Sequence, residues 1–387
     1  MKNIQLMNKI AKVGTDVFDC GKYNVAADVE NPDAIMVRSA AMHDLEFGDD
    51  LQAIARCGAG VNNIPIERCT KEGIVVFNTP GANANGVKEL AICALLLAAR
   101  KVVGGIEWAK TLEGTEGVAK AVEAGKSKFA GGEIMGKTLG VVGLGAIGGM
   151  VANSALALGM KVEGYDPYLS VEAAWSISRD VKKAASYEDI YKTADYITLH
   201  VPSTPTTKNM ICADTIAMMK DGVRIINLSR ADLVNAADMK AALESGKVAA
   251  YVTDFPTEDI LGIDGVVAIP HLGASTAESE DNCAVMAAQQ LVDYLENGNI
   301  KNSVNFPNVS SPKTDDTRIC VLHANVPTII QQITSVLAEL GVNIENYLNK
   351  SKGDNAYSMI DVSADIGKDA ETKLGAIEGV YSVRVID

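Results

Sequence analysis

The chain has 387 residues, 48% of them hydrophobic and 22% charged, which is enough for two or three domains with buried cores. Its net charge of −14 argues against nucleic acid or a membrane surface as a partner, because both would repel it. Seven scattered cysteines without a C-x-x-C pair argue against disulfides and zinc, so we expect no metal. We find no signal-peptide pattern and no apolar run of membrane-spanning length, which predicts a cytoplasmic protein.

Apolar runs of strand length alternate with helical patterns from about residue 34 to residue 270, which predicts parallel α/β structure. The first series has expected strands at 34–40, 51–59 and 73–80, and a long helical pattern follows at 85–111. A second series begins at Lys137, and its number of strands suits one doubly wound sheet. Its expected strands are 137–143, 161–166, 195–202, 223–230, 248–255 and 265–273.

The last part of the chain differs in pattern. Residues 276–298 are predicted to form one helix that ends at a glycine, and a Pro- and Ser-containing linker is expected at 303–316. Residues 317–387 then follow the order strand, helix, two strands, helix, strand. This order predicts a small ferredoxin-like module.

The stretch "GLGAIG" supplies a G-x-G-x-x-G motif at Gly143, Gly145 and Gly148, between an expected strand and an expected helix. Glycines there allow a tight turn and the approach of a pyrophosphate to the helix N-terminus. The next expected strand ends at Asp166, 23 residues after Gly143, where a carboxylate can bind ribose hydroxyls. The 2′-phosphate of NADP would lie about 4 Å from this carboxylate, and the repulsion between them would cost on the order of 4 kcal/mol per unit charge. NAD is therefore favoured over NADP.

Three side chains able to do chemistry stand at the ends of different strands of this second series. His271 is the candidate general base, and Glu258 is expected to orient it. Arg230 can clamp a carboxylate and polarise a carbonyl. Each has a structural alternative, as a surface or satisfied residue, but parallel strands bring their carboxyl ends to one sheet edge. Their coincidence beside one dinucleotide motif therefore predicts an active site.

Several motifs in this order resemble the D-isomer-specific 2-hydroxyacid dehydrogenases, namely "GLGAIG", "GYDP", "HVP", "INLSR", "DFPTE" and "PHLGAST". The stretches "VRSA", "ARCGAGVNNI" and "FNTPGANANGVKELA" resemble the phosphoglycerate dehydrogenase branch of that family. The resemblance implies NAD-dependent oxidation of 3-phospho-D-glycerate to 3-phosphohydroxypyruvate, an early step toward serine. It also implies that His271 is the acid/base, Glu258 its partner and Arg230 the group that holds the substrate.

The resemblance further implies two doubly wound parallel sheets, one flavodoxin-like and one Rossmann. It assigns residues 1–100 and 276–302 to a substrate (lid) domain and residues 101–275 to the NAD-binding domain. The implied substrate contacts are Arg38, Ser39, Arg56, Gly58, Gly60 and Lys126. The implied cofactor contacts beyond the glycines and Asp166 are Ala146, Ile147, His200, Leu228 and Asp254. The family aspartate near the nicotinamide aligns with Thr253, and Asp254 can replace it only if the strand is shifted by one residue.

Residues 317–387 resemble an ACT domain, an amino-acid-sensing module, and His323, Asn325 and Asn343 match its serine-binding positions. Thr328 replaces the glycine usual in that loop, so L-serine as effector and a purely assembling role both stay open. The resemblance implies a homo-oligomer, at least a dimer. Two other functions remain as alternatives: a glyoxylate or hydroxypyruvate reductase, and a non-enzymatic regulator that senses a dinucleotide or an amino acid.

Overall fold

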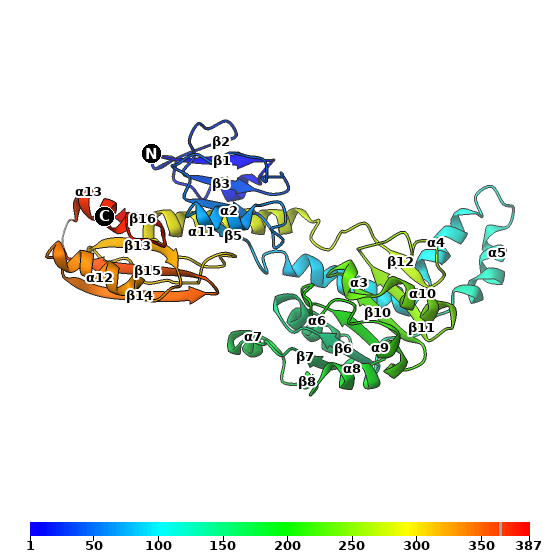
Figure 1. The fold of residues 1–387 in the computed structure, drawn as a ribbon. Helices are drawn as coiled ribbons and strands as arrows, with labels where there is room; N and C mark the ends of the chain where they lie inside the picture. Colours follow the sequence, from blue (N-terminus) through cyan, green and yellow to red (C-terminus); the bar gives the residue numbers. More distant parts are fainter. Residues whose placement is uncertain (364–365) are drawn as a thin grey trace. The chain divides into compact units, whose positions relative to one another are not determined.

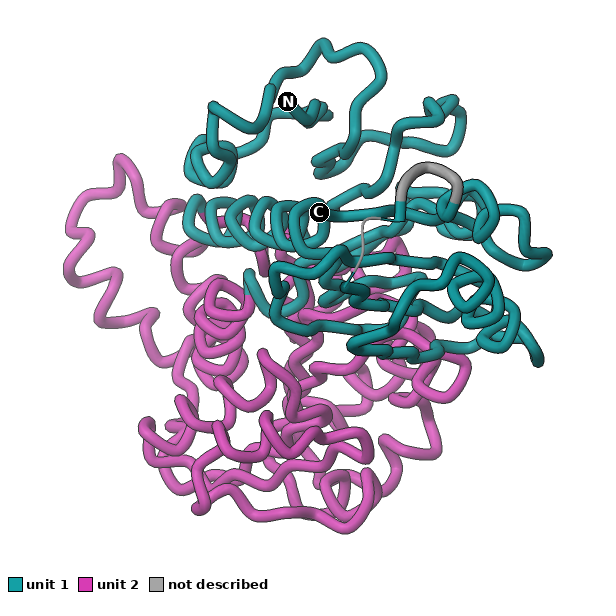
Figure 2. Tube along the Cα trace, turned by 90° about the vertical axis from the view of Figure 1, so that its left-hand side faces the viewer, with its two compact units in different colours: residues 1–83, 277–387 teal, residues 84–276 magenta. Residues whose placement is uncertain are grey.

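The structure is a computed structural model that describes residues 1–363 and 366–387 (Figure 1). The chain divides into two compact units, coloured separately in Figure 2. Unit 1 contains residues 1–83 and 277–387, and unit 2 contains residues 84–276. Among the described residues, no helix is both long and apolar enough to cross a membrane.

Unit 2 is built on a seven-stranded parallel sheet in the order β12-β11-β10-β9-β6-β7-β8. Counted from β6, this order is that of a doubly wound Rossmann sheet extended by one strand. The strands are β6 (Thr138–Val142), β7 (Lys161–Tyr165), β8 (Lys182–Lys183), β9 (Tyr196–Leu199), β10 (Val223–Asn227), β11 (Val248–Thr253) and β12 (Val266–Ala268).

Helices cover both faces of this sheet, which explains why its central strands are almost continuously apolar. On one face, α3 (Ala84–Ala99) and α6 (Ala146–Ala157) pack on side chains such as Leu139 and Val141. On the other face, α8 (Tyr187–Thr193), α9 (Ala213–Met218) and α10 (Ala236–Glu244) pack on side chains such as Ile197 and Leu199. Unit 2 also contains the short helix α7 (Val171–Ser176) and the 3-10 turn η2 (Ala231–Leu233).

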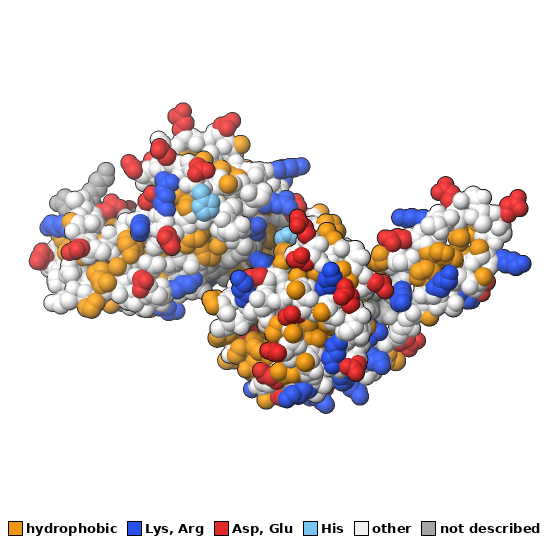
Figure 3. All heavy atoms as spheres, turned by 45° about the vertical axis from the view of Figure 1, so that its right-hand side comes forward, with side chains coloured by type: hydrophobic (Ala, Val, Ile, Leu, Met, Phe, Trp, Pro, Cys, Tyr) orange, Lys and Arg blue, Asp and Glu red, His pale blue; other side chains and the backbone are white. Residues whose placement is uncertain are grey.

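Helix α3 corrects the expected domain boundary at residue 100. Its small and apolar residues, including Ala91 and Leu95, are fully buried against α6, β10 and β11, so residues 84–99 belong to unit 2. The chain then forms an arm of α4 (Val102–Lys110), α5 (Val118–Gly125) and η1 (Lys126–Phe129). No residue of α4 is buried, and hydrophobic side chains are visible on the surface of this arm in Figure 3.

Unit 1 begins with a five-stranded parallel sheet in the order β2-β1-β3-β4-β5, which is flavodoxin-like. Its strands are β1 (Lys2–Met7), β2 (Tyr23–Ala26), β3 (Ala34–Val37), β4 (Ala53–Arg56) and β5 (Val75–Phe77). Two short helices belong to this part, α1 (Lys12–Thr15) and α2 (Ile66–Lys71). The long helix α11 (Ala277–Asn297) packs across β3 and β4 and buries Leu291 and Tyr294 in the same core.

Residues 317–387 form an antiparallel sheet in the order β14-β15-β13-β16, with two helices. The elements are β13 (Thr317–Ala324), α12 (Ile329–Glu339), β14 (Ile344–Lys352), β15 (Asn355–Val362), α13 (Gly367–Gly375) and β16 (Val380–Ile386). Their order is that of a ferredoxin-like module, so the predicted fold class of three sheets is confirmed.

This module packs against the rest of unit 1, and part of the segment 303–316, the expected linker, is buried in that packing. One face of its sheet buries Ile319 and Val321 under α12 and α13. The opposite face places Cys320 and Leu322 in one core with Tyr294 of α11. The connecting segment is fixed as well, since Phe306 is fully buried in that core.

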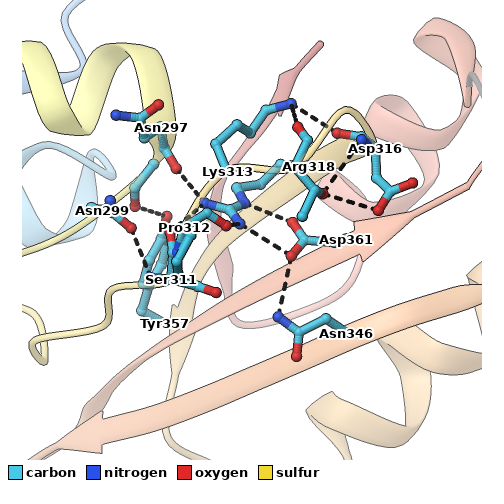
Figure 4. Close-up of polar contacts among 12 residues, drawn as sticks. Asn297, Asn299, Ser311, Pro312, Lys313, Asp316, Arg318, Asn346, Tyr357 and Asp361 are labelled. Carbon is cyan, nitrogen blue, oxygen red and sulfur yellow. Dashed lines mark hydrogen bonds and ion pairs between the residues drawn. The ribbon is translucent and has the colours of Figure 1, made fainter.

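Arg318 is a buried junction between this module and the rest of unit 1 (Figure 4). Its Nε and Nη2 donate to the two carboxylate oxygens of Asp361 at 2.6 and 3.1 Å. Its Nη1 donates to the carbonyl oxygens of Asn297, at the end of α11, and Ser311. Its Nη2 also donates to the carbonyl oxygen of Pro312. The guanidinium therefore joins helix, connecting segment and sheet in one hydrogen-bonded cluster.

Candidate active site

The glycine-rich turn lies between β6 and α6, as the sequence predicts, and two of its glycines have no room for a side chain. Gly143 has φ +88°, and a Cβ atom there would lie 2.5 Å from the carbonyl oxygen of His200. A Cβ on Gly148 would lie 1.9 Å from the carbonyl oxygen of Gly143. A Cβ on Gly145 would meet no atom within 4 Å, so the space beside it is open. The turn thus brings the first amides of α6, at Ala146 and Ile147, next to open space.

Asp166 directly follows β7, and the glycine turn itself holds its carboxylate. Its Oδ2 accepts a hydrogen bond from the amide of Leu144 at 2.9 Å, and its Oδ1 accepts one from the amide of Tyr168 at 2.8 Å. A surface pocket of about 500 Å³ lies here, lined by Tyr165, Asp166, Pro167, Lys183, Ala184 and Ala185. Lys183, which the sequence did not single out, therefore borders the same pocket as the carboxylate.

His200 follows β9 and lies against the glycine turn. A Cβ on Gly148 would be 3.4 Å from the Cβ of His200. The imidazole Nε2 lies 2.9 Å from the hydroxyl of Thr198, while its buried Nδ1 has no hydrogen-bond partner within the described residues. Burial lowers the pKa of His200 to about 4, so the ring is neutral at physiological pH. Leu228, which follows β10, is buried.

Arg230 and His271, from two different strand ends, meet one aromatic ring. Arg230 follows β10 and His271 follows β12, while β11 lies between these two strands and leads into Phe255. The ring centroids of His271 and Phe255 are 4.5 Å apart, and the Cζ atom of Arg230 lies 5.8 Å from the centroid of Phe255. Both polar side chains are exposed, and His271 has φ +46°, an uncommon conformation for a residue with a side chain.

Glu258 does not lie where the pairing with His271 requires. It is exposed in the turn after β11, and across residues 1–363 and 366–387 its carboxylate makes no hydrogen bond or ion pair. The imidazole of His271 has no hydrogen-bond partner in the same part of the chain. The base and the carboxylate that the sequence paired are thus not in contact.

Asp254, which is almost fully buried, makes contacts with the loop that carries His271. Its backbone oxygen accepts a hydrogen bond from the amide of His271 at 2.9 Å, and its Oδ2 accepts one from the amide of Gly273 at 3.1 Å. Its Oδ1 is buried without a partner among the described residues. Burial raises the pKa of Asp254, although the Gly273 amide and the nearby His271 act in the opposite direction.

Thr253, the ungapped match to the family aspartate, has a different environment. It is fully buried, and its hydroxyl accepts a hydrogen bond from the amide of Phe255 at 3.1 Å. The pairing of β10 with β11 skips Ala249, so β11 contains one extra residue at its beginning. Sequence periodicity does not reveal such an irregularity, which is why Thr253 and Asp254 could not be distinguished beforehand.

The expected substrate-binding arginines lie at neighbouring strand ends of unit 1. Arg56 ends β4, and its Nε donates to the carbonyl oxygen of Arg38, the residue after β3, at 3.2 Å. The guanidinium of Arg56 occupies the space where Gly58 would carry a Cβ atom. Arg38 forms an ion pair with Glu280 of α11, a partner that the sequence did not suggest.

A single side chain organises the backbone around these arginines. The amide oxygen of Asn8 accepts hydrogen bonds from the amides of Arg38, Ser39 and Ala40 at 3.3, 3.1 and 2.9 Å. The loop after β4 contains Gly58, with φ +143°, and Gly60. Lys126 lies in the arm of unit 2 and is ion-paired with Glu123.

The expected effector residues are engaged in internal contacts. His323 is buried, with Nδ1 2.8 Å from the carbonyl oxygen of Ala324 and Nε2 3.0 Å from the hydroxyl of Ser358. Asn325 donates to the carbonyl oxygen of Gly353, and Asn343 donates to Glu345. Thr328 adopts φ +73° before α12, so this loop keeps a left-handed position without a glycine.

Comparison with known proteins agrees with this geometry. Residues 93–273 match the family model described as "D-isomer specific 2-hydroxyacid dehydrogenase, NAD binding domain". The D-3-phosphoglycerate dehydrogenase of Escherichia coli K12 is 33% identical over 357 residues, which cover 88% of this chain and 83% of that protein. The chain belongs to the D-isomer specific 2-hydroxyacid dehydrogenase family.

Other members of the family support the same assignment. The D-3-phosphoglycerate dehydrogenase of Methanocaldococcus jannaschii is 34% identical over 81% of this chain, which spans only 59% of that relative's length. A solved structure of NAD+-bound 3-phosphoglycerate dehydrogenase from Entamoeba histolytica is similar with a TM-score of 0.61 and 26% identity. The similarity covers 79% of this chain and 98% of that one. The additional length of some relatives has no counterpart in these 387 residues.

Proposed function

We propose that this member of the family is an NAD-dependent dehydrogenase that oxidises 3-phospho-D-glycerate to 3-phosphohydroxypyruvate. The observation that carries the proposal is the meeting of Arg230 and His271 on Phe255, at the same sheet edge as the glycine turn. A base and a carboxylate-binding cation beside a dinucleotide motif are what oxidation of a 2-hydroxy acid needs. The relatives named D-3-phosphoglycerate dehydrogenase support this substrate.

The residues around the glycine turn fit NAD. Open space beside Gly145 and the adjacent α6 amides suit a pyrophosphate, and the carboxylate of Asp166 suits ribose hydroxyls. The unpaired polar atoms of His200 and Asp254 leave hydrogen-bonding capacity for the rest of the cofactor. When bound, the nicotinamide would accept the hydride from C2 of the substrate.

His271 would remove the proton of the substrate hydroxyl, and Arg230 would hold the substrate carboxylate and stabilise the developing carbonyl oxygen. Glu258 is exposed and unpaired in this structure. It can orient His271 only if substrate binding rearranges the turn in which it lies. Asp254 already binds the backbone of the His271 loop through its main-chain and side-chain oxygens.

Unit 1 is proposed to supply the groups that recognise the phosphate. Arg38 and Arg56 carry adjacent positive charges, and the amides of the Gly58–Gly60 loop follow β4 directly. Ser39 adds a hydroxyl beside Arg38, and Lys126 of unit 2 is a weaker candidate because it is exposed and paired with Glu123. This concentration of cationic groups favours a phosphorylated substrate over glyoxylate or hydroxypyruvate.

A panel of 2-oxo acids with NADH tests the proposed function. Phosphohydroxypyruvate should give the highest kcat/KM, well above hydroxypyruvate and glyoxylate. His271→Asn should lower kcat by about 10²–10⁴-fold, the usual contribution of a general base, and Arg230→Ala should also lower kcat/KM strongly. His43→Asn, an exposed histidine of unit 1, is the matched control and should retain activity. Near wild-type turnover of His271→Asn would refute the assigned chemistry.

We further propose that the protein is a homo-oligomer, at least a dimer, and the exposed apolar residues Val102, Val103 and Ile106 of the α4 arm support this. L-serine as an effector is a separate proposal. The internal contacts of His323 and the threonine at position 328 favour a structural role for the C-terminal module. Adding L-serine to the same assay distinguishes the two roles, since an assembling module leaves the rate unchanged.

A further inference from the structure

Phe255 contacts both side chains on which the proposed reaction depends, although nothing in the sequence pattern assigns it a role. The imidazole of His271 is tilted by 46° against its ring at 4.5 Å between centroids. The guanidinium of Arg230 lies 5.8 Å from the same ring. One apolar side chain therefore contacts both the proposed base and the proposed carboxylate clamp.

Few other contacts hold these two side chains. Within the described residues, the only hydrogen bond of the Arg230 guanidinium is to the carbonyl oxygen of Ser229, its neighbour in the chain, at 2.6 Å. The imidazole of His271 makes none there, and Glu258 does not reach it. Both side chains are exposed, so without a further contact each would populate several rotamers. The ring of Phe255 is the shared restraint.

Buried polar side chains hold the backbone at Phe255 and at Arg230. Its amide donates to the hydroxyl of Thr253, which is fully buried. The side-chain amide of Asn227, also fully buried, donates to the carbonyl oxygen of Arg230 at 2.8 Å and to the hydroxyl of Tyr251 at 3.3 Å. The backbones at Arg230 and Phe255 are thus fixed by adjacent strand ends, which gives the ring a defined position.

We propose that Phe255 is a positioning residue that holds His271 and Arg230 in their reactive arrangement; this rests on the proposed function. Proton uptake by His271 during oxidation creates a second cation near the guanidinium. The negative face of an aromatic ring attracts cations, and the guanidinium of Arg230 lies over the ring of Phe255. Asp254, from the end of β11, is a charged group near both His271 and Arg230. The aromatic contact therefore helps to orient both side chains for the reaction.

Phe255→Leu and Phe255→Tyr are the variants that test this role. Leucine keeps apolar volume but removes the aromatic face, whereas tyrosine keeps it. Phe255→Leu should lower kcat roughly 10- to 100-fold, the range expected when a reacting group is misplaced by about 1 Å. The Kd for NADH should stay unchanged, and Phe255→Tyr should restore most of the turnover. Equal kcat values in wild type and Phe255→Leu would overturn the proposal.

A readout without turnover separates this inference from the proposed function. The chain has four histidines to label with ¹³C, and the signal that disappears in His271→Asn is that of His271. The His271 signal should lose its ring-current shift in Phe255→Leu and keep it in Phe255→Tyr. An unchanged signal in Phe255→Leu contradicts the contact. A wild-type protein that turns over no 2-oxo acid refutes the proposed function, while the NMR comparison still decides whether Phe255 holds His271.

Discussion

The buried Arg318–Asp361 pair provides the sharpest test of how the C-terminal module is held. Arg318 is fully buried, and the side chain of Asp361 is 4% exposed. Asp361→Asn removes one charge and leaves a buried guanidinium without its counter-ion, a change that typically costs 3–5 kcal/mol. Three carbonyl oxygens, from Asn297, Ser311 and Pro312, would still accept its hydrogen bonds. We therefore expect a loss near the lower limit, about 3 kcal/mol, or roughly 100-fold in the local opening equilibrium.

The pH dependence follows from the same pair. Burial acts to raise the pKa of Asp361, but hydrogen bonds from Arg318 and Asn346 outweigh it, so the folded pKa lies below the usual value. The corresponding stability is fully present above the unfolded pKa of about 4 and is lost as the pH falls through the folded value. Asp361→Asn should abolish this acid-dependent part of the stability.

Removing both charges should cost less than the sum of the single changes. Arg318→Met leaves a buried carboxylate and three unpaired carbonyl groups, whereas Arg318→Met with Asp361→Leu leaves no charge and only the carbonyl groups and the side-chain amide of Asn346 without partners. We expect a coupling energy of at least about 2 kcal/mol between the two positions. Additive effects would show that the ion pair does not act as a unit.

Hydrogen exchange measured by mass spectrometry is the suitable assay, with peptides covering β13 and β15. Tryptophan fluorescence would miss the change because Trp108 and Trp175 both belong to unit 2. Faster exchange in these peptides, with unit 2 unaffected, is the expected result. Exchange free energies within about 0.5 kcal/mol of wild type for Asp361→Asn would refute the reasoning, since this is the range of neutral surface substitutions.

Three further outcomes follow from the site. Gly148→Ala should abolish NADH binding in a fluorescence titration, because its Cβ would lie 1.9 Å from the carbonyl oxygen of Gly143; retained affinity would contradict the tight turn. Asp166→Ser should raise the NADPH-to-NADH ratio of kcat/KM at least about 10-fold by removing repulsion of a 2′-phosphate, and an unchanged ratio would rule out that role. Glu280→Gln should release Arg38 and lower KM for phosphohydroxypyruvate by up to about 5-fold at low salt, since exposed ion pairs contribute at most about 1 kcal/mol. A higher KM would mean that Glu280 assists binding.

Local sequence signals predicted the features that depend on neighbouring residues. The alternation of apolar runs and helical patterns gave the parallel sheets, and the glycine spacing placed the turn between β6 and α6. The position of Asp166 directly after β7 followed from the same pattern. Strand ends also led to Arg230 and His271, because parallel strands present their carboxyl ends at one edge.

Features that depend on tertiary packing could not be predicted from the sequence. The apolar residues of α3 suit either unit, and only their burial against α6 and β10 decides. The alternation in β13 shows two buried faces but not what covers the second one. Phe255 resembles an ordinary core residue in sequence, and the exposure of Glu258 depends on how its turn folds. The ion pair of Arg38 with Glu280 joins residues 242 positions apart.

Hydrogen bonds and apolar packing join the ferredoxin-like module to helix α11 of unit 1. Arg318 binds the carbonyl oxygen of Asn297 at the end of this helix, and Arg384 of β16 donates to those of Tyr294 and Leu295. Deleting residues 317–387 would leave these carbonyl groups without donors and expose the apolar side chains now packed beneath the sheet. A shortened chain should therefore aggregate unless that surface is redesigned, so the module cannot be removed or exchanged without destabilising the rest of unit 1.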